Sequence, residues 1–149
     1  MAKIRLTKEF RFEMAHALWN YDGLCRNIHG HSYILYVTVI GEPISDIADP
    51  KLGMVMDFGD LKQIVCGEIV DVLDHAIVLN KSTPNLEQLN IPQMFDRHFY
   101  VDYQPTCENM IVDFAERIKK QLPERIQLHS LKLHETASSF AEWYAADNE

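Results

Sequence analysis

The chain has 149 residues, of which 47% are hydrophobic and 24% are charged, as expected for one globular domain over residues 1–149 that buries a core. Its 14 basic and 22 acidic side chains give a net charge of -8, which argues against nucleic-acid binding, because such proteins carry basic patches for phosphate. No apolar run could span a bilayer and no secretory signal is recognisable. Three cysteines without a disulfide-framework spacing indicate a reducing compartment, so a cytoplasmic protein is expected.

Two segments near the N-terminus alternate between apolar and polar residues, which is typical of half-buried strands. They cover residues 3–16 and 31–40. His16 continues the apolar face of the first strand, and His29 and His31 continue the apolar face of the second. If the strands pair antiparallel, the three imidazoles meet at one end of that face.

The three histidines form a candidate metal site. Imidazole is the commonest biological zinc ligand, and three protein ligands with an open fourth position are typical of catalytic zinc. Zinc is favoured over iron because the set lacks the carboxylate of a facial triad. Cys25, in the loop between the strands, could close the site as a fourth ligand. A catalytic role is favoured, since structural sites usually contain several thiolates and zinc promotes the anionic form of a nearby thiol.

A short strand and a helix are the next predicted elements. Residues 53–58 predict the strand. Asp60 is the predicted N-cap of the helix, and Gln63 completes a capping-box-like pair. Apolar residues then recur at helical spacing from Leu61 to Leu73, which gives the helix one buried face.

The second half begins with a long excursion of mixed character at residues 80–104, which includes a possible short strand. Arg97 in this excursion could meet an anion, but a solvated arginine is the favoured interpretation. A second helix follows with Thr106 as its N-cap. Two strands, residues 126–136 and 140–144, end the series. This order predicts an α+β fold, an antiparallel sheet with helices on one face.

Three further side chains could carry chemistry. His75 follows the first helix directly, where the helix dipole favours a histidine without any further role. The alternative is that Asp74 orients His75 as a general acid/base. Glu135 continues the apolar face of a late strand, so it lies either at an exposed strand end or where it binds the paired N–H donors of a heterocycle.

Together these motifs resemble the 6-pyruvoyltetrahydropterin synthase superfamily, and within it the bacterial 6-carboxytetrahydropterin synthases of queuosine (7-deazaguanine) biosynthesis. The resemblance runs nearly end to end. The segments that carry it are Phe12-Glu13-Met14-Ala15-His16, Cys25-x-x-x-His29-Gly30-His31-Ser32, Gly53-Met54-Val55-Met56-Asp57-Phe58, Asp74-His75, Pro105-Thr106-Cys107-Glu108-Asn109 and His134-Glu135-Thr136. The three-residue gap after Cys25 is similar to the carboxy-forming branch, since the pyruvoyl-forming enzymes usually carry a longer gap.

The resemblance implies a tunnelling fold with two helices packed on one face of the sheet. It also implies subunits that join edge to edge into barrels, commonly hexamers built from two trimers, with active sites between subunits. The implied site residues are His16, His29 and His31 for Zn²⁺, Cys25 as proton acceptor, Asp74 and His75 as acid/base relay, Glu135 as pterin anchor, and Thr106 and Glu108 as pocket residues.

The activity implied is that of a zinc-dependent lyase that converts 7,8-dihydroneopterin triphosphate to 6-carboxytetrahydropterin, acetaldehyde and triphosphate. One alternative is the pyruvoyl-forming reaction, which eliminates triphosphate without breaking the carbon chain. The other is a non-catalytic zinc-stabilised oligomeric module, in which Cys25 closes the metal site. The excursion between His75 and Thr106 is longer than in compact members, which leaves the pocket rim and the contacts of the substrate tail unassigned. No nucleic-acid or membrane partner is expected.

Overall fold

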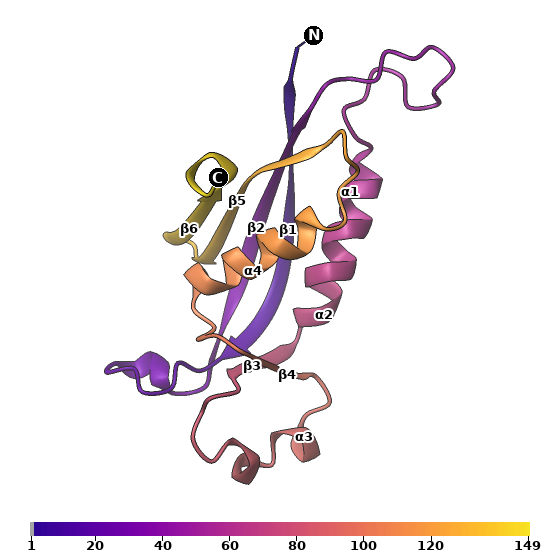
Figure 1. Cartoon of the computed structure of the whole chain (residues 1–149). Coiled ribbons are helices and arrows are strands. Elements are labelled where there is room, and N and C mark those ends of the chain that lie inside the picture. The colour runs from indigo at the N-terminus through magenta and orange to yellow at the C-terminus, as the bar shows by residue number, and fades with distance from the viewer. Residues whose placement is uncertain (1) are drawn as a thin grey trace.

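The computed structural model describes residues 2–149 and is built on one six-stranded sheet with the order β4-β3-β1-β2-β5-β6 (Figure 1). β1 (Ile4–His16) and β2 (His29–Gly41) pair antiparallel along their whole length, as predicted. β5 (Gln127–Thr136) pairs antiparallel with β2, and β6 (Ser139–Tyr144) pairs antiparallel with β5. The four long strands therefore confirm the antiparallel part of the predicted sheet.

The other edge of the sheet is parallel. β3 (Ala76–Asn80) pairs parallel with β1, and β4 (His98–Val101) pairs parallel with β3. β4 corresponds to the short strand predicted within the excursion, whereas the alternation pattern misses β3. All five residues of β3 are buried, and a strand buried on both faces gives a continuous apolar run without period-two alternation.

The excursion at residues 80–104 is an ordered cover over this parallel edge. It contains α3 (Ile91–Met94) and a 3₁₀ turn (Leu86–Leu89). Leu86 and Ile91 pack with Ile77 and Leu79 into a small second core. Ile77 lies beside Ala15 in the strand register, on the face opposite to the buried side chains of β1. The excursion therefore builds structure on the face of the sheet that the main helices leave free.

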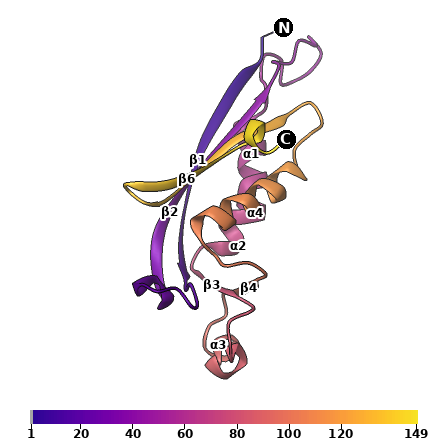
Figure 2. The same ribbon diagram turned by 60° about the vertical axis from the view of Figure 1, so that its left-hand side comes forward.

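Two helical segments cover the other face of the sheet, as predicted (Figure 2). The first runs through α1 (Phe58–Val65), a π-helical turn (Cys66–Val70) and α2 (Asp71–Leu73). The second is α4 (Cys107–Lys119), whose predicted N-cap is confirmed because the side chain of Thr106 accepts a hydrogen bond from the Asn109 N–H. Short 3₁₀ turns complete the chain at Leu24–Arg26 and Ala145–Asp147.

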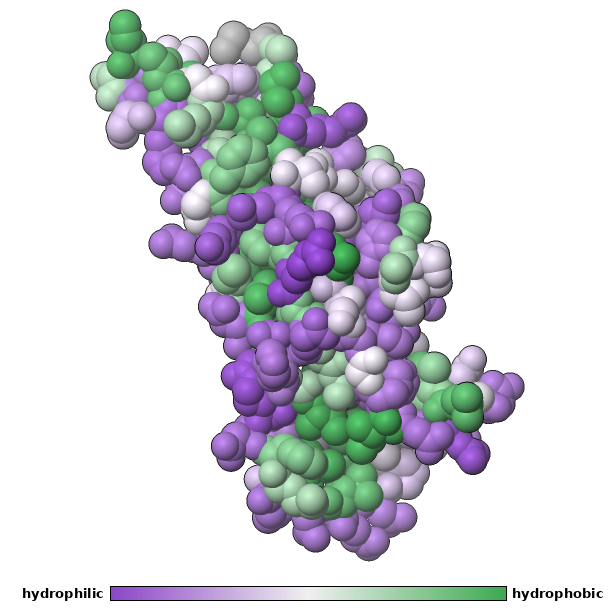
Figure 3. Space-filling model, turned by 180° about the vertical axis from the view of Figure 1, so that it is seen from behind, coloured by the Kyte–Doolittle hydropathy of each residue, from purple (hydrophilic) through white to green (hydrophobic). Residues whose placement is uncertain are grey.

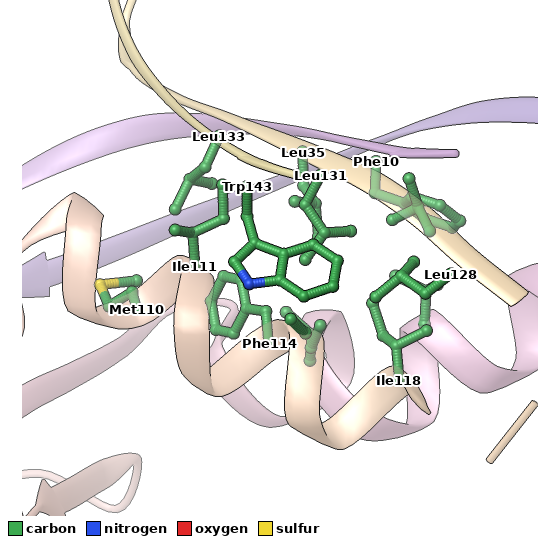
Figure 4. Close-up of a cluster of buried hydrophobic side chains, with 14 of the residues drawn as sticks. Phe10, Leu35, Met110, Ile111, Phe114, Ile118, Leu128, Leu131, Leu133 and Trp143 are labelled. Atoms are coloured by element: carbon green, nitrogen blue, oxygen red, sulfur yellow. The ribbon is translucent and has the colours of Figure 1, made fainter. Parts of the chain in front are cut away.

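The main core lies between these helices and the sheet. Phe114 and Ile118 of α4 pack there against Leu131 of β5 and Trp143 of β6 (Figure 4). This packing fixes the position of α4, and therefore of its N-terminus, relative to the strand ends. No helix within residues 2–149 has the length and apolar character that crossing a membrane requires.

The predicted strand at residues 53–58 is wrong. This stretch consists of turns and bends, and the helix begins at Phe58 with Asp57 as its N-cap. Asp57 Oδ1 accepts the Gly59 N–H at 2.6 Å, whereas Asp60, the predicted cap, lies inside the first turn. Contacts with Lys51 and the Gly59 N–H hold the pKa of Asp57 below its ordinary value. Of the apolar residues that suggested a strand, Val55 and Met56 are buried on the core, whereas Met54 and Phe58 are exposed.

Replacing Asp57 with Ala is expected to lower the free energy of unfolding by about 1 kcal/mol, because the Gly59 N–H loses its acceptor. Asp60→Ala is the matched control, since each carboxylate contacts Lys51 Nζ, at 3.0 and 2.8 Å. The control is expected to cost less than about 0.5 kcal/mol. Urea unfolding at one protein concentration measures both, and equal losses would contradict the assignment of Asp57 as the cap.

Candidate active site

The three predicted metal ligands meet at one end of the β1–β2 pair. His16 lies opposite His29 in the register, and Met14 lies opposite His31, so the three imidazoles project from the face that the parity of the strands predicts. One potential ligand atom from each ring lies within 4.8 Å of the other two. The ring centroids are 4.6, 4.9 and 5.2 Å apart. The three histidines are therefore close enough to hold one metal ion.

Backbone carbonyl groups orient two of these rings. His16 Nδ1 lies 2.7 Å from Pro105 O, and His29 Nδ1 lies 2.7 Å from Asn27 O. A carbonyl oxygen only accepts, so each neutral ring carries its proton on Nδ1 and a lone pair on Nε2. These two Nε2 atoms lie 3.0 Å apart, where facing lone pairs repel each other unless a cation lies beside both. The donor set and its orientation fit a divalent metal such as zinc.

Burial favours the neutral, ligating form of the histidines. The His16 side chain is 1% exposed, and burial is the main cause that lowers its pKa to about 4. Burial also lowers the pKa of His31, against the opposite effect of Glu135. Glu135 Oε1 lies 3.1 Å from His31 Nε2, a buried nitrogen that has no hydrogen bond of good geometry within residues 2–149. Metals bind neutral imidazole, so these shifts prepare the site for an ion.

A pocket of about 650 Å³ brings four other predicted residues together. Glu135 of β5, Thr106 and Glu108 at the N-terminus of α4, and Cys25 of the β1–β2 loop all line it. The loop is closed by a 2.9 Å hydrogen bond from the Leu18 N–H to Cys25 O. The volume is within the range of small-molecule sites. Because Glu135 contacts His31, this pocket adjoins the histidine cluster.

Cys25 lies outside the group of mutually close ligand atoms. Within the described part of the chain that group consists of His16, His29 and His31. A thiolate that closed a four-ligand zinc site would lie about 2.3 Å from the ion, in van der Waals contact with the imidazole nitrogens. The geometry therefore favours three protein ligands and one open position.

His75, whose neighbour in the chain is Asp74, lies in a different pocket. His75 lines a pocket of about 700 Å³ that shares no lining residue with the pocket of Cys25 and Glu135. Glu13 also lines the His75 pocket, and its side chain projects from β1 on the face opposite to the core residue Met14. Within one chain, Cys25 and His75 therefore line separate pockets, and His31 lines the pocket of His75 while it contacts Glu135 of the other.

The turn that carries His75 is strained and well held. His75 has a φ of 61°, and a left-handed conformation at a residue other than glycine costs about 1–3 kcal/mol. Asp74 Oδ2 lies 3.0 Å from His75 Nδ1, as the predicted orienting role requires. Asp74 Oδ1 accepts the Glu13 N–H at 2.8 Å, and this hydrogen bond is the main cause that lowers the pKa of Asp74. An ionised Asp74 holds the His75 proton on Nδ1 and leaves Nε2 free.

Sequence patterns miss one wall of the Cys25 pocket. Asn80 and Gln104 line this pocket. Asn80 Nδ2 donates to Gln104 Oε1 at 3.3 Å, and Gln104 Nε2 donates to Trp19 O at 2.9 Å. Asn80 is a buried polar residue at the end of the apolar run that forms β3. An amide residue directly after such an apolar run is the sequence signal from which Asn80 could have been predicted as a pocket residue.

Comparison with known proteins decides the family. Residues 5–146 match the model of the family described as 6-pyruvoyl tetrahydropterin synthase. The chain belongs to the 6-pyruvoyl tetrahydropterin synthase family. It is an enzyme of this family, and the resemblance stated from its motifs is confirmed.

Named relatives and a solved structure agree with this assignment. The 6-carboxy-5,6,7,8-tetrahydropterin synthase of Haemophilus influenzae is 36% identical over 141 residues, which cover 93% of this chain and 97% of the relative. Human 6-pyruvoyl tetrahydrobiopterin synthase is 34% identical over 116 residues, which cover 76% and 66% of the two chains. The structure of Caenorhabditis elegans 6-pyruvoyl tetrahydropterin synthase, 24% identical, covers 97% of both chains with a TM-score of 0.67. The predicted tunnelling fold is thereby confirmed.

Proposed function

We propose that the protein is a zinc-dependent lyase of queuosine precursor biosynthesis that converts 7,8-dihydroneopterin triphosphate and one water molecule to 6-carboxytetrahydropterin, acetaldehyde and triphosphate. The observation that carries the proposal is the set of three close imidazoles beside the pocket of Cys25 and Glu135. The carboxy-forming reaction is favoured over the pyruvoyl-forming one because the Haemophilus influenzae relative matches nearly the whole of both chains.

Each residue of the pocket would have a separate role in the reaction. When bound, zinc would polarise oxygen atoms of the substrate side chain and so acidify the neighbouring C–H bonds. The thiolate of Cys25 would accept the proton that leaves carbon. The Glu135 carboxylate would accept hydrogen bonds from the paired N–H donors of the pterin edge. Thr106 and Glu108 would fix the position of the ring, since they line the same pocket.

A second copy of the chain would bring His75, oriented by Asp74, to this pocket. The reaction needs both proton-transferring groups at one substrate, whereas Cys25 and His75 line separate pockets of one chain. Exposed apolar side chains surround the His75 pocket, with Met94 66% and Phe95 47% exposed. Figure 3 shows apolar residues gathered in the lower part of its face, at the end of the molecule where Figure 1 labels α3. Such a patch favours burial against another subunit, which supports a homo-oligomer with shared sites and, by resemblance, a hexamer.

Mixed oligomers of two inactive variants are expected to recover activity. In an oligomer assembled from equal amounts of Cys25→Ala and His75→Gln chains, about one quarter of the shared sites contain both native residues. Refolding the two variants together and measuring kcat per site tests this expectation. A mixture of Cys25→Ala and Asp74→Ala chains is expected to recover activity in the same way. Each variant refolded alone is expected to stay inactive. Absence of recovery in assembled mixed oligomers would place both residues in sites formed by one chain.

Product identification tests the reaction itself. Zinc-loaded protein is incubated with 7,8-dihydroneopterin triphosphate, and the pterin and any trapped aldehyde are identified by mass spectrometry. The proposal requires 6-carboxytetrahydropterin and acetaldehyde in equal amounts. A pyruvoyl pterin without acetaldehyde would support the alternative synthase reaction. No turnover, together with a zinc–sulfur bond from Cys25, would support the non-catalytic module.

A further inference from the structure

Arg97 closes the end of the helix that precedes His75. Its guanidinium donates three hydrogen bonds, all 2.8 Å long, from Nε to Asp74 O and from Nη2 to Asp71 O and Val72 O. The last carbonyl groups of a helix have no partner within the helix. The planar guanidinium can satisfy several of them at once because its donors are fixed in one fork. Arg97 remains exposed, as interpreted from the sequence, but its guanidinium also binds the end of this helix.

The strained turn at His75 is held from two sides. On one side, the His75 N–H donates to Glu13 O at 2.6 Å, and the Glu13 N–H donates to Asp74 Oδ1 at 2.8 Å. On the other side, Arg97 Nε binds the carbonyl of the peptide bond that joins Asp74 to His75. The backbone of Arg97 is itself fixed, because its carbonyl accepts the Ile77 N–H at 3.0 Å. The left-handed conformation of His75 therefore depends on contacts from β1 and from the excursion.

The contacts of Arg97 point to a role in geometry. Each hydrogen bond of its guanidinium within residues 2–149 ends on a backbone carbonyl, and no ion pair of these residues involves it. Arg97 lines the same pocket as His75, but its Nε and Nη2 donors bind the helix end. A side chain that uses its donors in this way sets the conformation of its neighbours.

We propose that Arg97 is a positioning residue for His75. It holds the carbonyl of Asp74, and with it the direction in which the His75 imidazole enters the pocket. The inference rests on the proposed function, in which His75 transfers a proton. It also assigns a task to the excursion at residues 80–104, which the resemblance leaves unassigned: the excursion returns to the sheet at β4 and delivers Arg97 to the end of α2.

The kinetic test compares Arg97→Met, which keeps the length of the side chain without its donors, with Arg11→Met. Arg11 is an exposed arginine of β1 whose contacts reach only the side chain of Glu9. Arg97→Met is expected to lower kcat about 100-fold with KM changed less than about threefold, because misplacing a reacting group by about 1 Å has an effect of that size. The kcat of Arg97→Lys is expected to lie between those of the native protein and Arg97→Met, since one ammonium group cannot reproduce the forked donors of the guanidinium. The control should keep native kinetics.

A double variant shows whether Arg97 acts through His75. The Arg97→Met/His75→Gln chain is expected to be no slower than His75→Gln alone, because the imidazole that Arg97 positions is already absent. Independent, multiplying losses would overturn the proposal. A raised KM with native kcat would assign Arg97 to direct contact with substrate. A lower melting temperature with native kcat would leave Arg97 as a helix cap only.

A readout without substrate separates this inference from the proposed function. Amide hydrogen exchange at residues 74–77 is expected to accelerate at least about tenfold in Arg97→Met and to stay unchanged in Arg11→Met. If the native protein does not carry out the lyase reaction, this measurement still decides whether Arg97 holds the turn. Unchanged exchange in Arg97→Met would overturn the proposal whatever the enzyme's activity.

Discussion

Replacing Cys25 with Ala is expected to remove turnover and leave zinc bound. Cys25 lies outside the group of histidine ligands but lines the pocket that Glu135 shares. Loss of a positioned proton acceptor lowers rates by about 100- to 10,000-fold. Three measurements on the same preparation separate metal binding, substrate binding and catalysis. They are the zinc content by mass spectrometry, the affinity for pterin by titration, and kcat.

Matched thiol variants make the Cys25 experiment decisive. Cys66 is partly buried in the π-helical turn and packs against the core, outside both pockets, so Cys66→Ala is expected to keep native kcat. Cys25→Ser retains a hydroxyl of similar size, but it should stay nearly inactive because an alcohol is a far weaker acid than a thiol. Loss of zinc from Cys25→Ala would instead identify the thiolate as a fourth ligand. Native activity would exclude Cys25 from proton transfer.

Removing one histidine of the cluster is expected to abolish both metal binding and turnover. His29→Gln deletes one of the three proposed ligands, whereas even the loss of a residue that only orients a ligand lowers metal affinity about 10- to 100-fold. A decrease in zinc affinity of more than about 100-fold is therefore expected. Isothermal titration of metal-free protein with zinc measures it, and kcat after zinc addition measures the consequence.

A histidine elsewhere on the sheet provides the control for His29→Gln. His129 lies on β5, partly buried, with Nδ1 3.1 Å from Ser130 Oγ. His129→Gln is expected to bind zinc and turn over substrate like the native protein. Chelation of the native protein should reproduce the His29→Gln phenotype, and zinc should reverse it. One tightly bound zinc per His29→Gln chain with native kcat would exclude the three-histidine site.

The histidine cluster could be predicted because its strands are half-buried. In β1 and β2 the fully buried apolar side chains share one parity and face the helices, while most polar ones face away, so parity assigns His16, His29 and His31 to one face. The same reasoning fails for β3, where a cover on both faces removes the alternation. It fails again at Asp57, because buried residues of a turn imitate a strand and shift the predicted helix start.

Long-range contacts set the limit of what the sequence predicts at the site. Motifs indicate that Cys25 and His75 belong to one reaction, but only the structure shows that they line separate pockets of one chain. Arg97 binds the end of α2 across 23 to 26 residues of sequence. No local pattern encodes that contact, because an arginine in an irregular segment has the same appearance whether it meets water or a helix end.

One backbone carbonyl links the two halves of the candidate site. Pro105 O orients the His16 ring, and the next residue, Thr106, caps α4 and lines the pocket with Glu108. An ion bound by His16 and a substrate ring bound against Thr106 would thus both restrain one short stretch of main chain. If the bound metal ion raises the affinity of the enzyme for the substrate by some factor, the bound substrate raises the affinity for the metal ion by the same factor, because coupling between two binding sites is reciprocal. We therefore expect cooperative assembly of the ternary complex, with the metal-loaded enzyme as the high-affinity receptor.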